Sequence, residues 1–190
     1  MADFAKALPF TMANEGGYQQ IASDPGNKSS DGLTWGTNMG ITRLTLTAWR
    51  KQTGGAPPKP EDIKGLAHSE AAAIYEALYW VPMGCRNMMS DRLATIVFDA
   101  AVVCGVGSVA RLMQSQIVLA NGGRLGIDGQ VGPLTLQALS RCDQEAMAHG
   151  LVDALGDRFA DLVIASPSLI AWLPNWRRRR TKWRQLALSI

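Results

Sequence analysis

Histidine and cysteine are scarce in this chain of 190 residues, which contains two histidines and three cysteines. The odd number of cysteines and the absence of any Cys-x-x-Cys pair exclude the common zinc and dithiol redox motifs. His68 and His149 are not spaced to complete a metal site either, so the sequence predicts no metal and no other cofactor. We expect Cys85, Cys104 and Cys142 to be buried free thiols, with one disulfide as the alternative in an oxidising compartment.

Long apolar runs are also absent. No stretch approaches the ~18 apolar residues that cross a bilayer. Residues 1–6 lack the basic start and the apolar core of a signal peptide. We therefore expect synthesis in the cytoplasm without a signal peptide, and no stable insertion into a membrane.

Charged residues are few and unevenly placed. They make up 18% of the chain and give a net charge of +3, yet residues 177–180 are four consecutive arginines. Such a run is most often a solvated helix face, and binding to an anionic polymer or lipid surface is the functional alternative. No zinc-finger spacing or RNA-binding motif accompanies the run, so nucleic acid is not an expected partner.

Alanine and leucine outnumber β-branched residues along most of the second half, and 47% of all residues are hydrophobic. This composition predicts a mainly α-helical fold that can bury a substantial core. We expect two lobes, residues 1–92 and 93–190, with a helix capped by Ser90 shared between them. Apolar residues recur at helical spacing in the stretches 4–15, 45–53, 69–81, 90–104, 108–120 and 143–165.

Between residues 16 and 42 the helical spacing is lost, and Gly, Ser, Asn, Asp and Pro accumulate. This composition predicts a long loop, with a small β-hairpin around residues 33–35. A loop of this length inside a compact domain is more often functional than not.

A carboxylate lies at the start of this loop. Glu15 ends the first expected helix, and Gly16 and Gly17 let the chain turn sharply after it. Asp24 and Thr37 follow in the loop. A glycosidase needs one carboxylic acid to protonate the glycosidic oxygen, and a second polar group for a water or the developing cation. Glu15 is our candidate acid, although a Glu-Gly-Gly tripeptide by itself is commonly only a helix end.

Three blocks of sequence follow one another closely in this part of the chain: Asn14-Glu15-Gly16-Gly17-Tyr18, Asp24-Pro25-Gly26 and Thr37-Asn38-Met39-Gly40-Ile41-Thr42. In their order and close spacing they resemble the glycoside hydrolase family 108 lysozymes, N-acetylmuramidases of bacteria and phages. The resemblance implies a lysozyme-like helical fold that cleaves peptidoglycan between N-acetylmuramic acid and N-acetylglucosamine. It also implies that Glu15 is the essential acid, and we assign Asp24, helped by Thr37, to the water or the oxocarbenium ion.

The chain departs from the family pattern at residues 27–35, which replace a shorter glycine-rich link. For this reason Asp31 is an alternative to Asp24 as the second carboxylate. The residues that we expect to contact substrate are Gly16, Gly17, Tyr18, Asp31, Asn38, Tyr79 and Asp128.

Four residues of the later helices are assigned either to substrate binding or to the protein core. Tyr79 is the candidate for stacking on a sugar, while Tyr75 and Trp80 are expected in the core. We interpret Asp99 as a buried, hydrogen-bonded structural acid.

Residues 128–135 read Asp-Gly-Gln-Val-Gly-Pro-Leu-Thr. They resemble the loop of small peptidoglycan-binding modules and of the C-terminal half of family 108. The resemblance implies that the second lobe binds the wall, with Asp128 among its contacts.

We expect a monomer that acts in the periplasm or cell wall, with peptidoglycan as its partner and an export machinery or a holin providing access. Two other functions stay open: a non-catalytic wall-binding module, and a lytic transglycosylase, which needs only one acid. The sequence separates neither a phage endolysin from a secretion-associated muramidase nor inversion from retention at the anomeric carbon.

Overall fold

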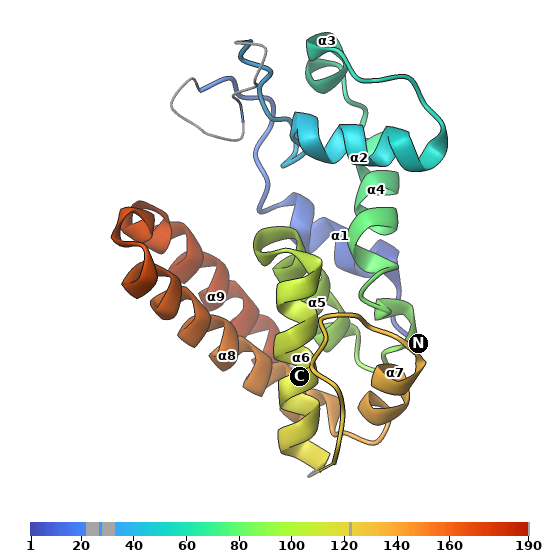
Figure 1. Cartoon of the computed structure of the whole chain (residues 1–190), viewed down its shortest axis with the longest axis vertical. Helices are drawn as coiled ribbons and strands as arrows, with labels where there is room; N and C mark the ends of the chain where they lie inside the picture. The colour runs from blue at the N-terminus through green and yellow to red at the C-terminus, as the bar shows by residue number, and fades with distance from the viewer. Residues whose placement is uncertain (22–26, 28–32, 122, 190) are drawn as a thin grey trace. The chain divides into compact units, whose positions relative to one another are not determined.

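The structure is a computed structural model of the whole chain, and it describes residues 1–21, 27, 33–121 and 123–189 (Figure 1). In these residues the regular structure is almost entirely helical, so the expected mainly α-helical fold is confirmed. The loop expected to hold a hairpin contributes two isolated bridges, Gln19–Thr37 and Asn38–Ile41. None of the helices described is long and apolar enough to span a membrane.

The chain divides into two compact units. We call residues 8–78 the small unit, and residues 1–7 with residues 79–190 the large unit. This division does not coincide with the expected boundary after residue 92. That position lies in the first turn of α5 (Asp91–Cys104), and α5 packs against three other helices of the large unit. A helix that buries its faces against one set of partners belongs with them.

The small unit contains the end of α1 (Phe4–Met12), α2 (Arg43–Thr53), α3 (Pro60–Lys64) and α4 (His68–Tyr75). Thr42 begins α2 as its N-cap, with Oγ1 accepting from the Thr45 backbone N–H at 3.3 Å. Gly54 ends α2 in the left-handed conformation, and its backbone N–H donates to the Arg50 carbonyl. The core side chains, each at most 1% exposed, are Ile41, Leu46, Ile63, Ile74 and Tyr75.

The large unit contains most of the remaining helices (Figure 1). Its main packing joins α5 to α6, α8 and α9, and α8 to α6 and α9. Three rings, Phe4, Trp80 and Phe98, form a cluster with centroids 5.5–5.7 Å apart. Trp80 is therefore a core residue, as expected. Besides α5, the helical elements are η2 (Glu76–Trp80, which spans the boundary between units), η3 (Cys85–Asn87), α6 (Val106–Asn121), α7 (Pro133–Leu139), α8 (Gln144–Ala165), η4 (Pro167–Trp172) and α9 (Leu173–Leu188).

Asp99 lies fully buried on α5 and holds α9 through two side chains. Arg179 donates to both carboxylate oxygens at 2.7 Å, and Trp183 Nε1 donates to Oδ2 at 2.7 Å. A buried carboxylate must be paired and hydrogen-bonded, and these donors satisfy that need. The interpretation of Asp99 as a structural acid is confirmed.

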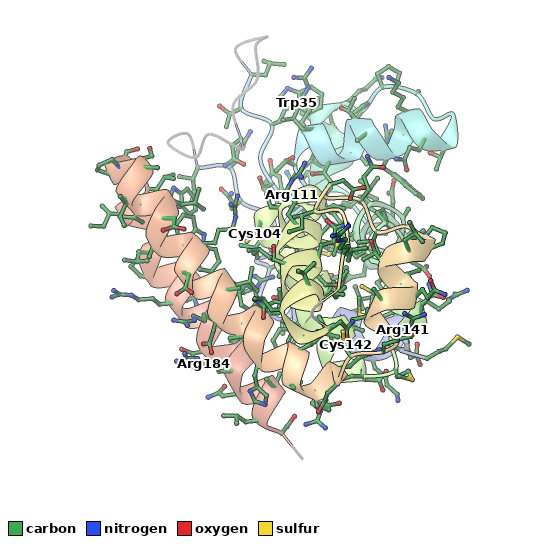
Figure 2. All side chains as sticks on the ribbon, turned by 60° about the horizontal axis from the view of Figure 1, so that its bottom comes forward. Trp35, Cys104, Arg111, Arg141, Cys142 and Arg184 are labelled. Carbon is green, nitrogen blue, oxygen red and sulfur yellow. The ribbon has the colours of Figure 1, made fainter. Side chains whose placement is uncertain are left out.

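The arginine run at 177–180 is therefore not one uniform solvated face. Arg179 turns inward to Asp99, with only 11% of its side chain exposed. Two arginines of α9 pair with Asp153 of α8. Nη2 of Arg180 and Nη2 of Arg184 lie 3.0 and 2.8 Å from Asp153 Oδ1 (Arg184 is labelled in Figure 2). Arg177 and Arg178 are exposed.

All three cysteines are free thiols, as expected, and the alternative of a disulfide is wrong. Cys104 ends α5, and Cys142 lies between α7 and α8 (Figure 2). Cys85 and Cys142 are buried, whereas Cys104 is half-buried. Burial raises the pKa of all three thiols, that of Cys104 to about 11.

Two adjacent arginines give a matched test of the buried ion pair. We expect Arg179→Gln to lower the free energy of unfolding by ~3–5 kcal/mol, because it leaves the Asp99 carboxylate buried without its cation. Arg178→Gln removes an exposed guanidinium and is expected to change it by less than ~0.5 kcal/mol. Urea unfolding of both variants measures the difference. Equal stability of the two would contradict a structural role for Arg179.

Candidate active site

Glu15 is positioned by the C-terminal end of α1. Its backbone N–H donates to the carbonyls of Thr11 and Met12, at 3.2 and 3.3 Å. The Asn14 side chain donates to the Phe10 carbonyl at 2.8 Å. The last carbonyls of a helix lack intrahelical partners, so residues 14 and 15 close the helix by supplying them. Glu15 consequently leaves the helix end from an anchored backbone, with its side chain half-buried.

Gly16 and Gly17 follow Glu15 at an open part of the surface. Neither has a backbone φ in the left-handed region, and a Cβ on either would meet nothing within 4 Å. The expectation that the turn needs glycine for its backbone angles is therefore wrong. The two glycines leave free space beside the carboxylate.

The segment from Asn38 to Ile41 forms a tight turn against Glu15. Asn38 and Ile41 exchange backbone hydrogen bonds at 3.1 and 2.8 Å. The two central residues, Met39 and Gly40, have φ of 47° and 71°. Two successive positive φ angles characterise the type I′ turn, which strongly prefers glycine.

Gly40 touches the candidate acid directly. A Cβ placed on Gly40 would lie 2.6 Å from Glu15 Oε2 and 2.6 Å from Tyr75 Oη. Both oxygens therefore pack against the bare Cα of Gly40. Any side chain at residue 40 would displace one of them.

Tyr75 supplies the buried wall of this arrangement. The side chain is 1% exposed, and its hydroxyl donates to the Met39 carbonyl at 2.6 Å. The sequence correctly predicted Tyr75 as a core residue but not that its hydroxyl would lie beside residue 40. The helical spacing of the stretch 69–81 indicated burial but not this contact.

Thr37 is tied to the segment that follows Glu15. Its backbone N–H and carbonyl pair with those of Gln19, both at 2.8 Å. Its hydroxyl lies 2.7 Å from Asn27 Oδ1. Asn27, which is fully buried, also contacts Gln19 and the Ile21 carbonyl. Asn27 was not among the predicted site residues.

The two candidates for the second carboxylate, Asp24 and Asp31, lie outside the described residues. Tyr18 lies inside them and packs its ring on Gly36, where a Cβ would meet Tyr18 Cε2 at 2.8 Å. Its side chain is 37% exposed, so part of the ring is accessible to a ligand.

Asn38, predicted to bind substrate, faces inward. Its Nδ2 donates to the carbonyls of Ile63 and Lys64 at the end of α3, at 3.0 and 3.2 Å. Only 8% of the residue is exposed. Its amide nitrogen therefore joins the turn to α3.

Asp128 organises its own loop in the large unit. Its Oδ1 accepts from Gln114 Nε2 at 2.8 Å and from the Gln130 backbone N–H at 2.9 Å. The hydrogen bond from Gln114 is the main cause that lowers the pKa of Asp128. Gln114, which is 1% exposed, also accepts from the Gly129 N–H. Asp128 nevertheless remains exposed.

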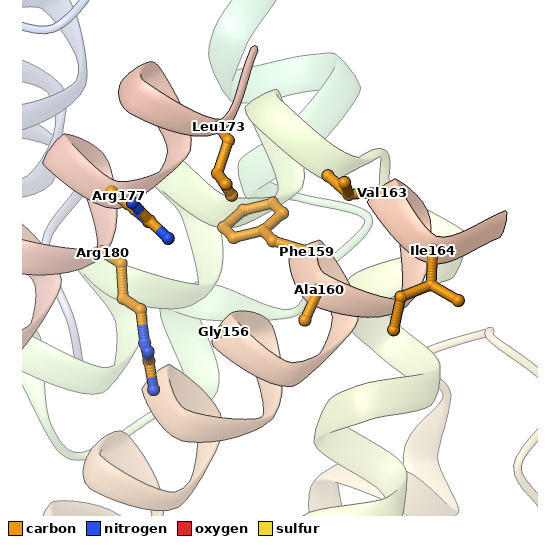
Figure 3. Close-up of a pocket in the computed structure, with 8 residues that line it drawn as sticks. All are labelled: Gly156, Phe159, Ala160, Val163, Ile164, Leu173, Arg177 and Arg180. Atoms are coloured by element: carbon orange, nitrogen blue, oxygen red, sulfur yellow. The ribbon is translucent and has the colours of Figure 1, made fainter. Parts of the chain in front are cut away.

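Tyr79 lies in η2, within the large unit, and is half-buried. A separate groove of about 370 Å³ lies between α8 and α9 (Figure 3). No carboxylate lines it, so it lacks an acid for glycosidic chemistry. Its lining residues are Gly156, Phe159, Ala160, Val163, Ile164, Leu173, Arg177 and Arg180.

The mainly helical fold is consistent with a lysozyme-like fold. The model of the family described as Glycosyl hydrolase 108 matches residues 8–105, and the chain belongs to this family. The family is one of peptidoglycan hydrolases, which makes peptidoglycan the substrate class.

The chain is also similar to a solved structure, that of SagA from Brucella abortus. The two are 26% identical with a TM-score of 0.71, and the match covers 98% of this chain and 96% of that one. A search of curated proteins finds no match.

Two glycines with the same backbone angle test the contact at Glu15. Gly40 and Gly54 both have φ of 71°, but a Cβ on Gly54 would meet nothing within 4 Å. We expect Gly40→Ala to lower peptidoglycan hydrolysis by ~100-fold, because the acid is displaced. Gly54→Ala carries the same backbone strain and is expected to keep near-normal activity. Turbidity loss of a wall suspension compares them, and normal activity in Gly40→Ala would exclude the contact as a requirement.

Proposed function

We propose that the protein is an N-acetylmuramidase that hydrolyses the bond between N-acetylmuramic acid and N-acetylglucosamine, with Glu15 as the general acid. One observation carries this proposal: the Glu15 carboxylate lies against Gly40, together with the Tyr75 hydroxyl, in a chain of the glycosyl hydrolase 108 family. The open space at Gly16 and Gly17 leaves room for a glycan beside the carboxylate.

In this mechanism protonated Glu15 gives its proton to the glycosidic oxygen as the bond to the anomeric carbon breaks. Asp24, assisted by Thr37, positions the attacking water or stabilises the oxocarbenium ion, and Asp31 is the alternative carboxylate. The separation of the two carboxyl groups decides between inversion, at about 6.5–9.5 Å, and retention, at about 5–5.5 Å.

The proposed place of action is the periplasm or cell wall, which the protein reaches through an export machinery or a holin, as a monomer. In the large unit, the exposed side of Asp128 and the exposed Arg177 and Arg178 are the proposed wall contacts. Arg179 has no such role, because its guanidinium is bound to buried Asp99.

Replacing Glu15 tests the acid. We expect Glu15→Gln to reduce the release of glycan fragments by ~100-fold or more, with unchanged unfolding temperature, because the amide cannot donate the proton. Glu61→Gln removes an exposed carboxylate of the same unit and serves as the control.

The measurement is digestion of purified peptidoglycan followed by mass analysis of the released ends. Reducing N-acetylmuramic acid ends are expected. Ends with a 1,6-anhydro ring would identify a lytic transglycosylase instead. Wall binding without any cleavage by the unmodified protein would identify a binding module.

The same assay shows which of the two loop carboxylates, Asp24 or Asp31, assists Glu15. We expect Asp24→Asn to lower turnover by ~10-fold, less than Glu15→Gln, because Thr37 still holds the water. Asp31→Asn is expected to have a smaller effect. A larger loss in Asp31→Asn would transfer the role of second carboxylate to Asp31.

A further inference from the structure

The helical hairpin made by α8 and α9 has a packed base and an exposed end. At the base, the buried rings of Phe159 and Trp183 lie with their centroids 6.2 Å apart, and Arg179 binds the buried Asp99. Figure 1 shows the two helices side by side, and η4 joins them. We call residues 162–176 the hairpin tip, and each of them is exposed or half-buried. The base therefore holds in place a tip whose own side chains pack only in part.

The hairpin tip is apolar and contains no charged residue. Ile164, Ile170 and Trp172 are 77%, 61% and 43% exposed. A single exposed apolar side chain is ordinary, but several in one uncharged stretch mark a surface that contacts another molecule or a membrane. The tip is therefore a candidate interaction surface.

Cations follow the hairpin tip directly. Arg177 and Arg178 are exposed. Arg177 and Arg180 also lie along the groove between α8 and α9, whose other lining residues are apolar (Figure 3). The exposed acids in this part of α8, Asp157 and Asp161, do not line the groove. The groove side of the hairpin therefore combines apolar side chains with positive charge.

This combination favours an anionic lipid surface over other occupants. Isoleucine and tryptophan enter the boundary between headgroups and acyl chains, while arginine binds anionic headgroups. Peptidoglycan is polar and has no apolar layer that would receive Ile164 and Ile170. In a symmetric dimer through the tip, Arg177 and Arg178 of one copy would approach those of the other, and like charges in an interface are costly.

We propose that the hairpin tip docks reversibly on an anionic phospholipid bilayer. Ile164, Ile170 and Trp172 enter the headgroup boundary, and Arg177 and Arg178 bind the lipid phosphates. The tip has 15 residues, fewer than the ~20 that a membrane-spanning helix needs, so it lies in the surface. The docking goes beyond the proposed function and does not depend on it. In a peptidoglycan hydrolase it would hold the enzyme where the membrane faces the wall.

Sedimentation of the full chain with vesicles measures the contribution of charge. We expect binding to vesicles of phosphatidylglycerol and phosphatidylethanolamine, and at least ~10-fold weaker binding to phosphatidylcholine vesicles. Arg177→Gln with Arg178→Gln should weaken binding to the anionic vesicles by ~20-fold, since each cation near such a surface contributes about fivefold. The control, Arg86→Gln with Arg124→Gln, removes two exposed cations of the same unit and should bind within about threefold of normal.

A second pair of variants measures the apolar contribution. Ile164→Ser with Ile170→Ser should weaken binding to the anionic vesicles by ~10-fold or more, because less apolar surface leaves water. The control is Leu119→Ser with Leu134→Ser, at positions of the same unit that are 76% and 74% exposed, and it should bind normally. Unfolding temperatures show that each variant is folded. If the isoleucine pair does not fold, Ile164→Ser alone replaces it.

Tryptophan emission reports whether the tip enters the lipid. Vesicles with brominated acyl chains quench tryptophans that reach the acyl boundary, and we expect them to quench part of the emission of the unmodified protein. Trp172→Phe should remove most of this quenching and still bind, because phenylalanine is also apolar. Quenching unchanged in Trp172→Phe would contradict the proposed orientation.

The other occupants give different results. Equal vesicle binding by either pair of variants and its control would overturn the proposal. Wall sedimentation weakened by the isoleucine pair, with normal vesicle binding, would assign the tip to peptidoglycan instead. A dimer in analytical ultracentrifugation that the isoleucine pair abolishes, without vesicle binding by the unmodified protein, would assign it to a second copy.

Failure of the proposed function is seen separately. The isoleucine pair should hydrolyse soluble peptidoglycan fragments at the normal rate, because neither residue belongs to the candidate site. Inactivity of the unmodified protein on these fragments would reject the proposed hydrolysis and leave the vesicle results standing. Normal hydrolysis without vesicle binding would reject the docking alone.

Discussion

The close approach of the Gly40 backbone to the Glu15 carboxylate is the contact on which the candidate site depends. It requires a residue without a side chain and a turn with two positive φ angles. The turn also binds α3 through Asn38, and the next residue, Thr42, caps α2. The position of the acid is therefore coupled to the packing of the small unit, because one short segment serves both.

Buried polar groups connect distant parts of the chain in each unit. Tyr75 donates to the Met39 carbonyl in the small unit, and Arg179 and Trp183 donate to Asp99 in the large unit. Each contact joins residues from different helices or loops, in an environment where an unpaired group would cost several kcal/mol, about 3–5 for the ion pair. Such contacts specify which faces meet, whereas apolar burial alone favours many similar arrangements.

Much of the secondary structure was predictable from local chemistry. Ser90 caps α5 through its side-chain oxygen, as expected, and Asp143, the first residue of the expected stretch 143–165, caps α8 in the same way. Asp99 was predicted as a buried structural acid because it stands among apolar neighbours at core positions. The boundary between units was not predictable from spacing, because the packing of α5 depends on helices that follow it by many residues. For the candidate site, the sequence named Glu15 and the turn motif, which stay predictions, but it gave no sign of the contacts that Asn27 and the Tyr75 hydroxyl make.

The sequence by itself determined the helical class, the Ser90 cap and the motif that carries the candidate acid. These follow from short-range effects: apolar spacing, capping hydrogen bonds and the chemistry of neighbouring residues. Only the tertiary structure decided that Arg179 faces Asp99 while Arg178 faces solvent, and that Asn27 faces Thr37. Identical side chains one residue apart differ in burial, and an asparagine in a polar loop resembles any other until its partners are known. The orientation of such groups depends on contacts between residues far apart in the chain, which local sequence does not encode.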